Sequence, residues 1–306
     1  IRPIRELELT ENSSSSDLVI PIYDVYYAVI RNNVLDTRLF ADPDAQGAQK
    51  ELYDAFSSYR NEAAGVLKDE LYSYHTPYCD LKKEYKNYET YIVSALYSRE
   101  ILRRDMIDTS DSVYTAWTTD ETISMYDFLQ YAVVNNWVDT ASLELGFSYA
   151  STGEVIDGIW KVIEDEITAE NEFSKLIYRY MLLSDTVTGK QICLALIEQG
   201  AVSVSDVEYE ELLSDAESSY YFMCARIENL DLTPAQLNLD PYSGSIVVVD
   251  PSSGEVLALV SYPSYDNNRM SNGVDAEYFA ALQNDRSTAL LTYATPQATA
   301  PGSTFK

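Results

Sequence analysis

A serine and a lysine three residues apart are the pair in this sequence whose types and spacing can do covalent chemistry: Ser303 and Lys306. A serine hydroxyl is a weak nucleophile near neutral pH and needs a base to take its proton. Residues i and i+3 of a helix lie on one face, with Cβ atoms about 5–6 Å apart, so a helix here would bring the lysine amine to the hydroxyl. The pair therefore predicts Ser303 as a nucleophile and Lys306 as its general base.

The residues just before this pair favour the start of a helix. Pro301 and Gly302 precede Ser303, which would then lie in the first turn with an N–H that has no partner in the helix. Such an N–H can serve as one donor of an oxyanion hole, and the positive end of the helix stabilises a developing negative charge. A helix start here would therefore support the serine in a second way.

Lys306 can act as a base only when its amine is neutral. The pKa of a free lysine is about 10.4, so a neutral amine near pH 7 requires a depression of roughly 3 units, or about 4 kcal/mol. Burial and neighbouring cations are the means by which a protein supplies it. The bare S-x-x-K pattern also occurs by chance, and its alternative explanation is an ordinary helix N-terminus with a solvated lysine. The segments that precede Ser303 are therefore needed to distinguish a catalytic pair from an ordinary helix N-terminus.

Other kinds of catalytic site are restricted by the composition. His75 is the only histidine, which excludes a zinc site built from several histidines, and we expect it to be on the surface or fully hydrogen-bonded. Cys79, Cys193 and Cys224 are widely spaced and predict neither a disulfide framework nor a metal site, so we expect three buried thiols. We expect no metal and no cofactor.

The chain of 306 residues is strongly acidic, with 21 Lys and Arg against 49 Asp and Glu and a net charge of -28. A nucleic acid needs a basic partner surface, and an anionic membrane repels an acidic one, so the charge argues against both as partners. Residues 1–232 carry 42 acidic and 18 basic side chains, whereas residues 233–306 carry 7 and 3. This change indicates a domain boundary near residue 232.

Residues 46–221 read as mainly helical, because apolar side chains recur at helical spacing. Most of the 26 tyrosines lie ahead of residue 233, and at that spacing we expect them to be half-buried core. Residues 1–20 predict a loop, and residues 20–30 predict either a strand or a short buried helix. Gly200 predicts the end of the last helix. The predicted helices cover 51–74, 81–102, 122–137, 155–167, 173–183 and 191–199.

The composition changes after Thr233, which suits a helix N-cap before Pro234 and a short helix that ends by Asp240. Two β-strands follow at residues 245–250 and 255–262. A turn joins them, with Pro251 at its second position and Gly254 in the left-handed conformation. Both strands are nearly continuously apolar, so we expect a central hairpin that is covered on both faces. Residues 275–282 predict another short helix.

Several linked segments of this C-terminal part resemble the opening of the transpeptidase domain of class B penicillin-binding proteins. They are Leu232-Thr233-Pro234-Ala235-Gln236-Leu237, Gly244-Ser245-Ile246-Val247-Val248-Val249-Asp250, Gly254-Glu255-Val256-Leu257-Ala258-Leu259-Val260-Ser261-Tyr262-Pro263-Ser264-Tyr265-Asp266-Asn267-Asn268 and Ala300-Pro301-Gly302-Ser303-Thr304-Phe305-Lys306. The resemblance implies a mainly helical, non-catalytic head over residues 1–232. It implies that residues 233–306 begin an α+β transpeptidase domain, with a β-hairpin followed by the catalytic helix.

The resemblance also implies an activity, namely peptidoglycan D,D-transpeptidation. Ser303 would attack the penultimate D-Ala of a stem peptide, with Lys306 as its base, and an amine of a neighbouring stem peptide would resolve the acyl-enzyme. β-Lactam antibiotics would acylate the same serine. Members of the family commonly work with a membrane glycosyltransferase on the outer face of the bacterial cell membrane, held by a single N-terminal anchor. No run of 18 apolar residues occurs in this chain, so we expect the anchor outside it.

Two departures from the family's pattern matter. Thr292-Tyr293-Ala294 stands where the family usually has Asn-Arg-Ala, which removes an arginine from the connector. The family's S-x-N and K-S/T-G motifs lie beyond the S-x-x-K motif and do not follow Lys306 here. We therefore expect a chain truncated at the S-x-x-K motif, which is inactive by itself.

Two further interpretations stay open beside the transpeptidase. The chain could be a non-catalytic interaction or scaffold module of the machinery that builds the cell wall, with a helical head that docks partners. It could also belong to a β-lactamase or a β-lactam sensor that uses the same serine, although the long acidic region ahead of the hairpin disfavours this. The presence of S-x-N and K-T-G in the parent gene would separate the transpeptidase from the scaffold.

Overall fold

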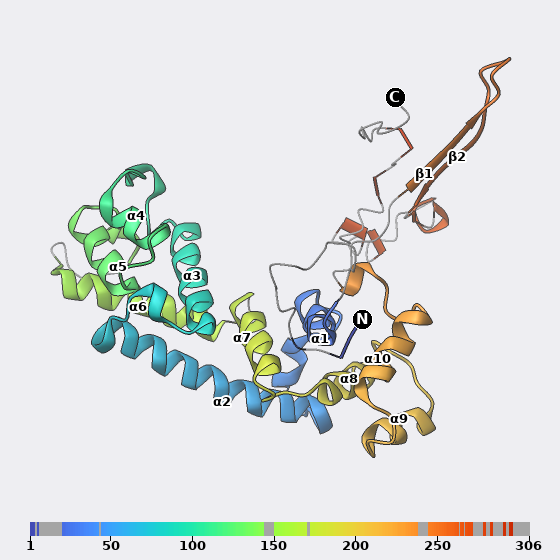
Figure 1. Cartoon of the computed structure of the whole chain (residues 1–306), viewed down its shortest axis with the longest axis horizontal. Helices are drawn as coiled ribbons and strands as arrows, with labels where there is room; N and C mark the ends of the chain where they lie inside the picture. The colour runs from blue at the N-terminus through green and yellow to red at the C-terminus, as the bar shows by residue number, and fades with distance from the viewer. Residues whose placement is uncertain are drawn as a thin grey trace, which may run out of the picture. The chain divides into compact units, whose positions relative to one another are not determined.

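The computed structural model describes residues 1–3, 5, 20–42, 44–143, 150–169, 172–237, 244–262, 264–265, 267–271, 278–279, 282–283, 290–291 and 294–295. These residues form ten α-helices and one two-stranded sheet, in agreement with the predicted mainly helical chain with a small β contribution (Figure 1). They divide into two compact units, residues 36–195 and residues 1–35 together with 196–306. The boundary predicted near residue 232 stays a prediction.

The unit of residues 36–195 is helical in its described part. Every helix predicted between residues 51 and 199 overlaps an observed one. Among the short helices that were not predicted, three begin after a capping aspartate, at Asp36, Asp111 and Asp139, whereas those at Tyr78–Asp80 and Arg104–Met106 have no side-chain cap. The elements are η1 (Thr37–Ala41), α2 (Gly47–Asp69), the π-helix η2 (Glu70–Tyr74), η3 (Tyr78–Asp80), α3 (Lys83–Ser98), η4 (Arg104–Met106), α4 (Ser112–Thr118), α5 (Met125–Val134), η5 (Thr140–Ser142), α6 (Thr152–Thr168), α7 (Glu172–Leu183) and the first part of α8 (Gly189–Glu198).

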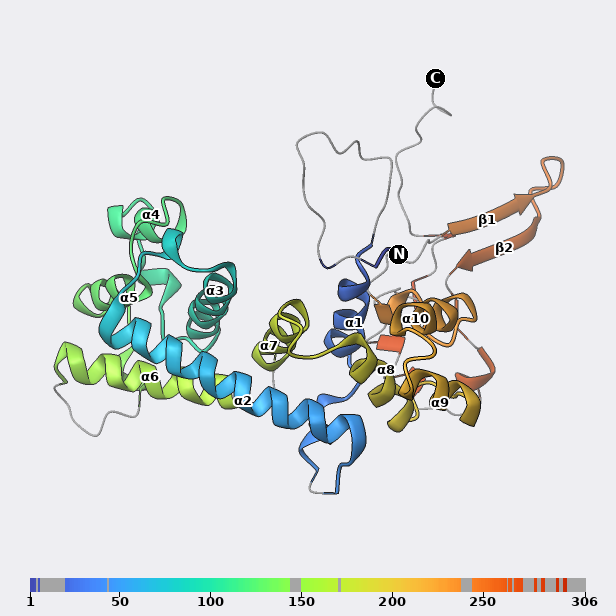
Figure 2. The ribbon, with the colours of Figure 1, turned by 60° about the horizontal axis from the view of Figure 1, so that its bottom comes forward.

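The long helix α2 is the element on which this unit is assembled. Its buried side chains Leu52, Phe56, Ala63 and Leu67 recur at helical spacing and form one apolar face. This helix packs against both α6 and α7, which lie beside it in Figure 2. The ring of Phe56 stacks on that of Tyr178 in α7, with centroids 4.6 Å apart and planes at 10°. The apolar face of α2 therefore faces the core of the unit.

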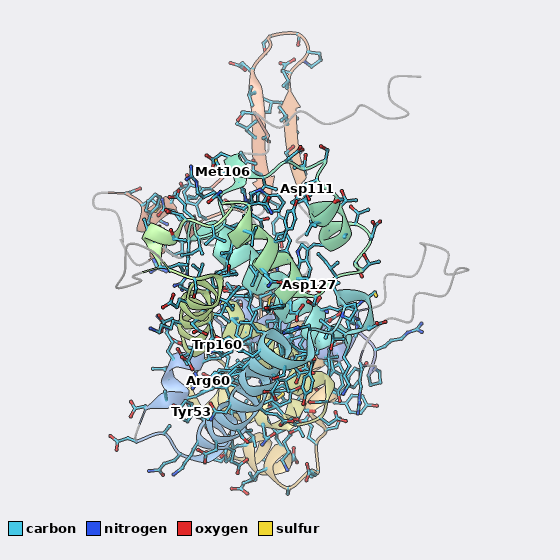
Figure 3. All side chains as sticks on the ribbon, turned by 90° about the vertical axis from the view of Figure 1, so that its left-hand side faces the viewer. Tyr53, Arg60, Met106, Asp111, Asp127 and Trp160 are labelled. Carbon is cyan, nitrogen blue, oxygen red and sulfur yellow. The ribbon has the colours of Figure 1, made fainter. Side chains whose placement is uncertain are left out.

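Side-chain caps begin the helices at the far end of α2. The Ser124 hydroxyl accepts a hydrogen bond from the Asp127 backbone N–H, and the Asp127 carboxylate accepts one from the Ser124 backbone, so α5 starts with a capping box. Asp111 accepts from the backbone N–H of Val113 and starts the short helix α4. The side chains of Asp111 and Asp127 are both marked in Figure 3.

The tyrosines of this unit belong largely to its core, as the sequence predicts. Tyr88 and Tyr178 are completely buried. A buried phenol needs a hydrogen-bond partner, and Glu84 supplies it by accepting from the hydroxyls of Tyr59 at 2.8 Å and Tyr88 at 2.9 Å. The tyrosines therefore join helices α2 and α3 through polar contacts as well as through their rings.

The other unit joins the two ends of the chain. The segment 20–30, for which the sequence left strand and helix open, is helix α1 (Ile22–Arg31). The hydroxyl of Tyr26 donates to Ser219 at the start of α10 (Ser219–Glu228), and the Asn32 amide donates to the Gln236 carbonyl oxygen. Helix α9 (Asp206–Leu213) precedes α10.

The helix boundaries in this second unit follow local sequence signals. Gly200 has φ +69, which confirms the predicted left-handed end after α8. Thr233 and Gln236 exchange hydrogen bonds in the manner of a capping box. The described helix there is the short η6 (Ala235–Leu237), and the remainder of the predicted segment up to Asp240 lies outside the described residues.

The predicted hairpin is present as β1 (Gly244–Val249) and β2 (Val256–Tyr262). The strands are antiparallel, with Gly244 opposite Tyr262 and an irregularity between Val248 and Val249. Its predicted burial is wrong for the described residues, because no described segment covers either face. Its large apolar side chains are between 43% and 65% exposed: Ile246, Val247, Val248, Val249, Val256, Leu257, Leu259, Val260 and Tyr262.

The histidine and the cysteines differ from expectation. His75 is half-buried and stacked on Tyr126, with ring centroids 3.9 Å apart, yet its Nε2 has no hydrogen-bond partner among the described residues. Of the three thiols only Cys193 is buried, whereas Cys79 is exposed and Cys224 is half-buried. Cys79 lies in the short η3 turn at the surface, where spacing along the sequence gives no sign of burial.

A buried carboxyl group carries an electrostatic cost in the unit of residues 36–195. Glu89 in α3 is 1% exposed, and its Oε2 has no hydrogen-bond partner in the described structure. Burial, together with the nearby negative charge of Glu70, raises the pKa of Glu89 to about 8. Between pH 4.5 and 8 the folded chain therefore keeps this carboxyl protonated while the unfolded chain ionises it.

We expect the free energy of unfolding to fall as pH rises through that range, since the unfolded state loses its proton first. Glu89→Gln removes this loss and should stabilise the chain by about 3 kcal/mol at pH 7, with little effect at pH 4. Denaturant unfolding at several pH values measures the difference. Glu164→Gln, at an exposed position of α6, is the matched control and should leave the pH dependence as it is. An unchanged pH dependence in Glu89→Gln would contradict the assignment.

Candidate functional site

The turn of the hairpin is held by its own side chains. The Asp250 carboxylate accepts hydrogen bonds from the backbone N–H of Ser252 at 2.8 Å and from its hydroxyl at 2.5 Å. These two bonds lower the pKa of Asp250 to about 2, so the carboxylate is ionised at any physiological pH. The negative charge of Asp250 therefore stabilises the turn through these hydrogen bonds.

The last residue of the turn takes the predicted backbone conformation. Gly254 has φ +77, and its N–H donates to the carbonyl oxygen of Asp250 at 2.8 Å. A side chain at this position would be strained by the left-handed backbone, although no atom stands within 4 Å of where its Cβ would lie. Backbone conformation, rather than lack of space, therefore requires the glycine.

The chain beyond the hairpin returns to β2. The Ser261 hydroxyl accepts a hydrogen bond from the backbone N–H of Ala294 at 3.1 Å. Ala294 lies in the connector, nine residues before Ser303. Ser261 is the one serine in the otherwise apolar and aromatic strand β2, and that contrast is the sequence signal that could have singled it out. The contact holds the connector against the hairpin, a short distance along the chain from the predicted nucleophile.

A second contact organises the segment just after the hairpin. The short helix η7 (Asn267–Arg269) carries Arg269, whose guanidinium lies 4.0 Å from the centre of the Tyr278 ring. Cation–π contacts of this kind contribute about 0.5–1 kcal/mol at exposed sites. Most of the helix predicted at residues 275–282 lies outside the described residues, although Leu282 at its end is buried.

The predicted catalytic residues Ser303 and Lys306 lie outside the described residues, together with Pro301 and Gly302. Their distance from one another and the predicted helix start therefore stay predictions. Within the part of the chain that is described, no group of three or more His, Cys, Asp or Glu side chains is placed to hold a metal ion. The described helices also include none that is long and apolar enough to cross a membrane.

Residues 244–306 match the family described as the penicillin binding protein transpeptidase domain. The match begins at the first residue of β1 and runs through the turn, the Ser261 contact and the S-x-x-K residues. The C-terminal part of this chain is thus of the penicillin-binding transpeptidase class.

Curated relatives agree over the same short stretch. Peptidoglycan D,D-transpeptidase MrdA of Haemophilus influenzae is 44% identical over 68 residues, which is 22% of this chain and 10% of that protein. MrdA of Escherichia coli K12 is 47% identical over 62 residues, 20% of this chain and 10% of that protein. Peptidoglycan D,D-transpeptidase PbpA of Mycolicibacterium smegmatis is 41% identical over 69 residues, 22% of this chain and 14% of that protein.

The matched stretch is about a tenth of the length of the MrdA relatives. No solved structure matches the chain. The similarity therefore identifies the hairpin and the residues that follow it as parts of a penicillin-binding protein transpeptidase, and the resemblance predicted from the motifs is confirmed there.

The turn offers a direct test of this geometry. Gly254→Ala should weaken the hairpin by about 1 kcal/mol, because alanine resists the left-handed backbone. Amide hydrogen exchange of Asp250, whose N–H donates to Glu255, should then become about fivefold faster. Gly254→Asn is the matched control, since asparagine tolerates this conformation, and it should change the rate less than twofold. Equal rates in the wild type and the alanine variant would contradict the requirement for glycine.

Proposed function

We propose that this chain carries the nucleophile and the general base of a serine-type peptidoglycan D,D-transpeptidase. The supporting observation is the family match over residues 244–306, which includes the hairpin and the S-x-x-K residues in one continuous stretch. In this proposal Ser303 is the nucleophile and Lys306 is the base. Residues 233–306 form the N-terminal portion of the transpeptidase domain, and residues 1–232 form a non-catalytic, acidic head.

The proposed reaction has two steps. The Ser303 oxygen attacks the carbonyl carbon of the penultimate D-Ala, and Lys306 takes the hydroxyl proton. The C–N bond to the terminal D-Ala breaks, and the lysine returns a proton to the leaving amine. In the second step an amine of a neighbouring stem peptide attacks the serine ester, Ser303 regains its proton, and a new peptide bond cross-links the two strands.

Substrates and partners follow from the same proposal. Stem peptides of peptidoglycan are the substrates, and β-lactam antibiotics acylate Ser303 because they present a strained amide to the same nucleophile. The enzyme works at the outer face of the bacterial cell membrane, alongside a membrane glycosyltransferase. The three curated relatives are named peptidoglycan D,D-transpeptidases, which supports the substrate class.

A penicillin-labelling experiment tests the catalytic assignment. In a protein that contains residues 1–306 together with the family's S-x-N and K-S/T-G motifs, labelled penicillin should form a covalent adduct on Ser303, located by peptide mass spectrometry. Ser303→Ala should abolish the adduct, whereas Ser287→Ala, at another serine of the matched segment, should keep it. No adduct, or one that survives Ser303→Ala, would sink the proposal. The 306-residue chain alone should form no stable adduct.

The role of Lys306 has its own measurement. Lys306→Met removes the base without a large change in volume, so acylation by penicillin should slow by a factor of about 100 or more. Lysine loses its proton as pH rises, and the acylation rate of the wild type should therefore rise with pH through the pKa of Lys306. A methionine variant with the wild-type rate and pH profile would show that another group takes the proton.

The alternative is a non-catalytic interaction module of the cell-wall machinery. It is favoured by the unit of residues 36–195, which is helical in its described part and lies wholly outside the family match. A parent protein without S-x-N and K-T-G, or one that does not react with penicillin, would support this alternative.

A further inference from the structure

A small cavity of about 290 Å³ opens between helices α3 and α4 in the unit of residues 36–195. One side is a single face of α3, because its lining residues are spaced at i, i+3, i+4 and i+7. The opposite side is formed by the C-terminal end of α4 and by Glu121, three residues beyond that helix. The lining residues are Tyr78, Thr90, Val93, Ser94, Tyr97, Trp117, Thr118 and Glu121.

The walls are fixed before any ligand arrives. The backbone N–H groups of Tyr78 and Cys79 donate to the carbonyl oxygens of Ile123 and Glu121, at 3.0 and 2.8 Å. The rings of Tyr78 and Trp117 meet edge to face at 5.0 Å, and Trp117 stacks on Phe128 behind it. A preformed wall lowers the entropy cost of binding.

The rim of the cavity carries charged side chains as well as uncharged hydroxyl groups. Glu121 forms an ion pair with Lys86 at 3.3 Å, and it is held with φ 56, a backbone conformation that costs a non-glycine residue free energy. Ser94, which is exposed, and Tyr97, which is half-buried, line the cavity, and neither hydroxyl makes a hydrogen bond to the described residues. Burial raises the pKa of Tyr97 to about 12, so its hydroxyl keeps its proton and can donate.

These features define the chemistry of a ligand. Aromatic walls suit the apolar C–H face of a sugar ring, and unpaired hydroxyls with an acceptor and a cation at the rim suit its hydroxyl and amide groups. An anionic ligand is disfavoured, because Lys86 is already paired with Glu121 and the chain carries a net charge of -28. The volume lies at the small end of ligand pockets, which favours one ring over an extended peptide.

We propose that this cavity binds one N-acetylated amino-sugar ring of a glycan strand, with the acetyl methyl group against Val93 and Trp117. The choice of glycan rests on the proposed function, since a transpeptidase that cross-links peptidoglycan works beside strands of such sugars. Binding itself involves no step at Ser303. The site would hold the strand on the helical unit of the enzyme.

Calorimetric titration of the 306-residue chain tests the site, with the β-1,4-linked tetramer of N-acetylglucosamine as the probe. We expect saturable binding to one site. Ser94→Ala and Tyr97→Phe, which each remove one unpaired hydroxyl, should weaken binding at least fivefold. Ser58→Ala changes a similarly exposed serine on α2 and is the matched control, which should bind as the wild type does. Thermal unfolding checks that all three variants fold.

Several outcomes would overturn the inference. They are the absence of saturable binding, equal binding by the wild type and the two cavity variants, and preferential binding of a peptide ending in D-Ala-D-Ala. Cellotetraose lacks the acetamido groups and should bind at least fivefold more weakly, so equal binding would overturn the choice of amino sugar. Penicillin labelling of Ser303 is measured separately. Failure of sugar binding with labelling intact therefore counts against this site alone, and the reverse result counts against the proposed function alone.

Discussion

The unit of residues 36–195 depends on the contact between the apolar face of α2 and helix α7, with Phe56 stacked on Tyr178 at its centre. Both rings are almost completely removed from water. Burial of aromatic side chains supplies large apolar areas, and a well-placed ring pair adds about 0.5–1.5 kcal/mol beyond its area. Helix α6 packs against the same long helix, and α3 packs against α6 and α7. The surfaces that face outward, including the cavity beside α3, are therefore positioned by a core that lies behind them.

Buried polar groups in that core differ in whether they have hydrogen-bond partners. Glu84 accepts hydrogen bonds from the hydroxyls of Tyr59 and Tyr88, and these bonds offset the free-energy cost of burying the Tyr88 phenol. Glu89, one turn further along the same helix and buried, has an oxygen without such a partner, and its pKa rises accordingly. Two carboxyl groups five residues apart on one helix thus differ in their effect on stability. Glu84 accepts hydrogen bonds from two tyrosine hydroxyls, whereas Glu89 is buried with an oxygen that has no donor among the described residues.

The hairpin presents the reverse situation. Its strands have the apolar composition of a buried sheet, yet the described residues leave both faces exposed to water. A two-stranded hairpin is marginally stable by itself. What holds its shape here is local, namely the Asp250 turn and the register of the two strands, together with the contact of Ser261 with Ala294. The proposed nucleophile follows this element along the chain.

Local signals in the sequence were sufficient for much of the fold. Helical spacing predicted α2, α3 and the helices α5 to α8, and the Pro251 and Gly254 positions predicted the turn, since each depends on residues close in the chain. The spacing did not decide between strand and helix for residues 20–30, where a helix forms after Pro21 and packs against residues from the other end of the chain.

The candidate catalytic pair was likewise a matter of sequence. Ser303 and Lys306 were predicted from their order after the hairpin motifs, and the family match over residues 244–306 includes both positions. The cavity between α3 and α4 could not be found in this way. Its walls come from α3, the end of α4 and the η3 turn, and only packing brings Ser94 and Trp117 to one space.

The sequence by itself therefore determined the elements, the turn and the class of its C-terminal part, because caps, periodicity and motifs are local properties of the chain. The tertiary structure decided burial. It removed the carboxyl group of Glu89 and the thiol of Cys193 from water, and its described residues leave the apolar hairpin exposed. Burial depends on what the rest of the chain places against a side chain, and spacing along the sequence carries no record of that.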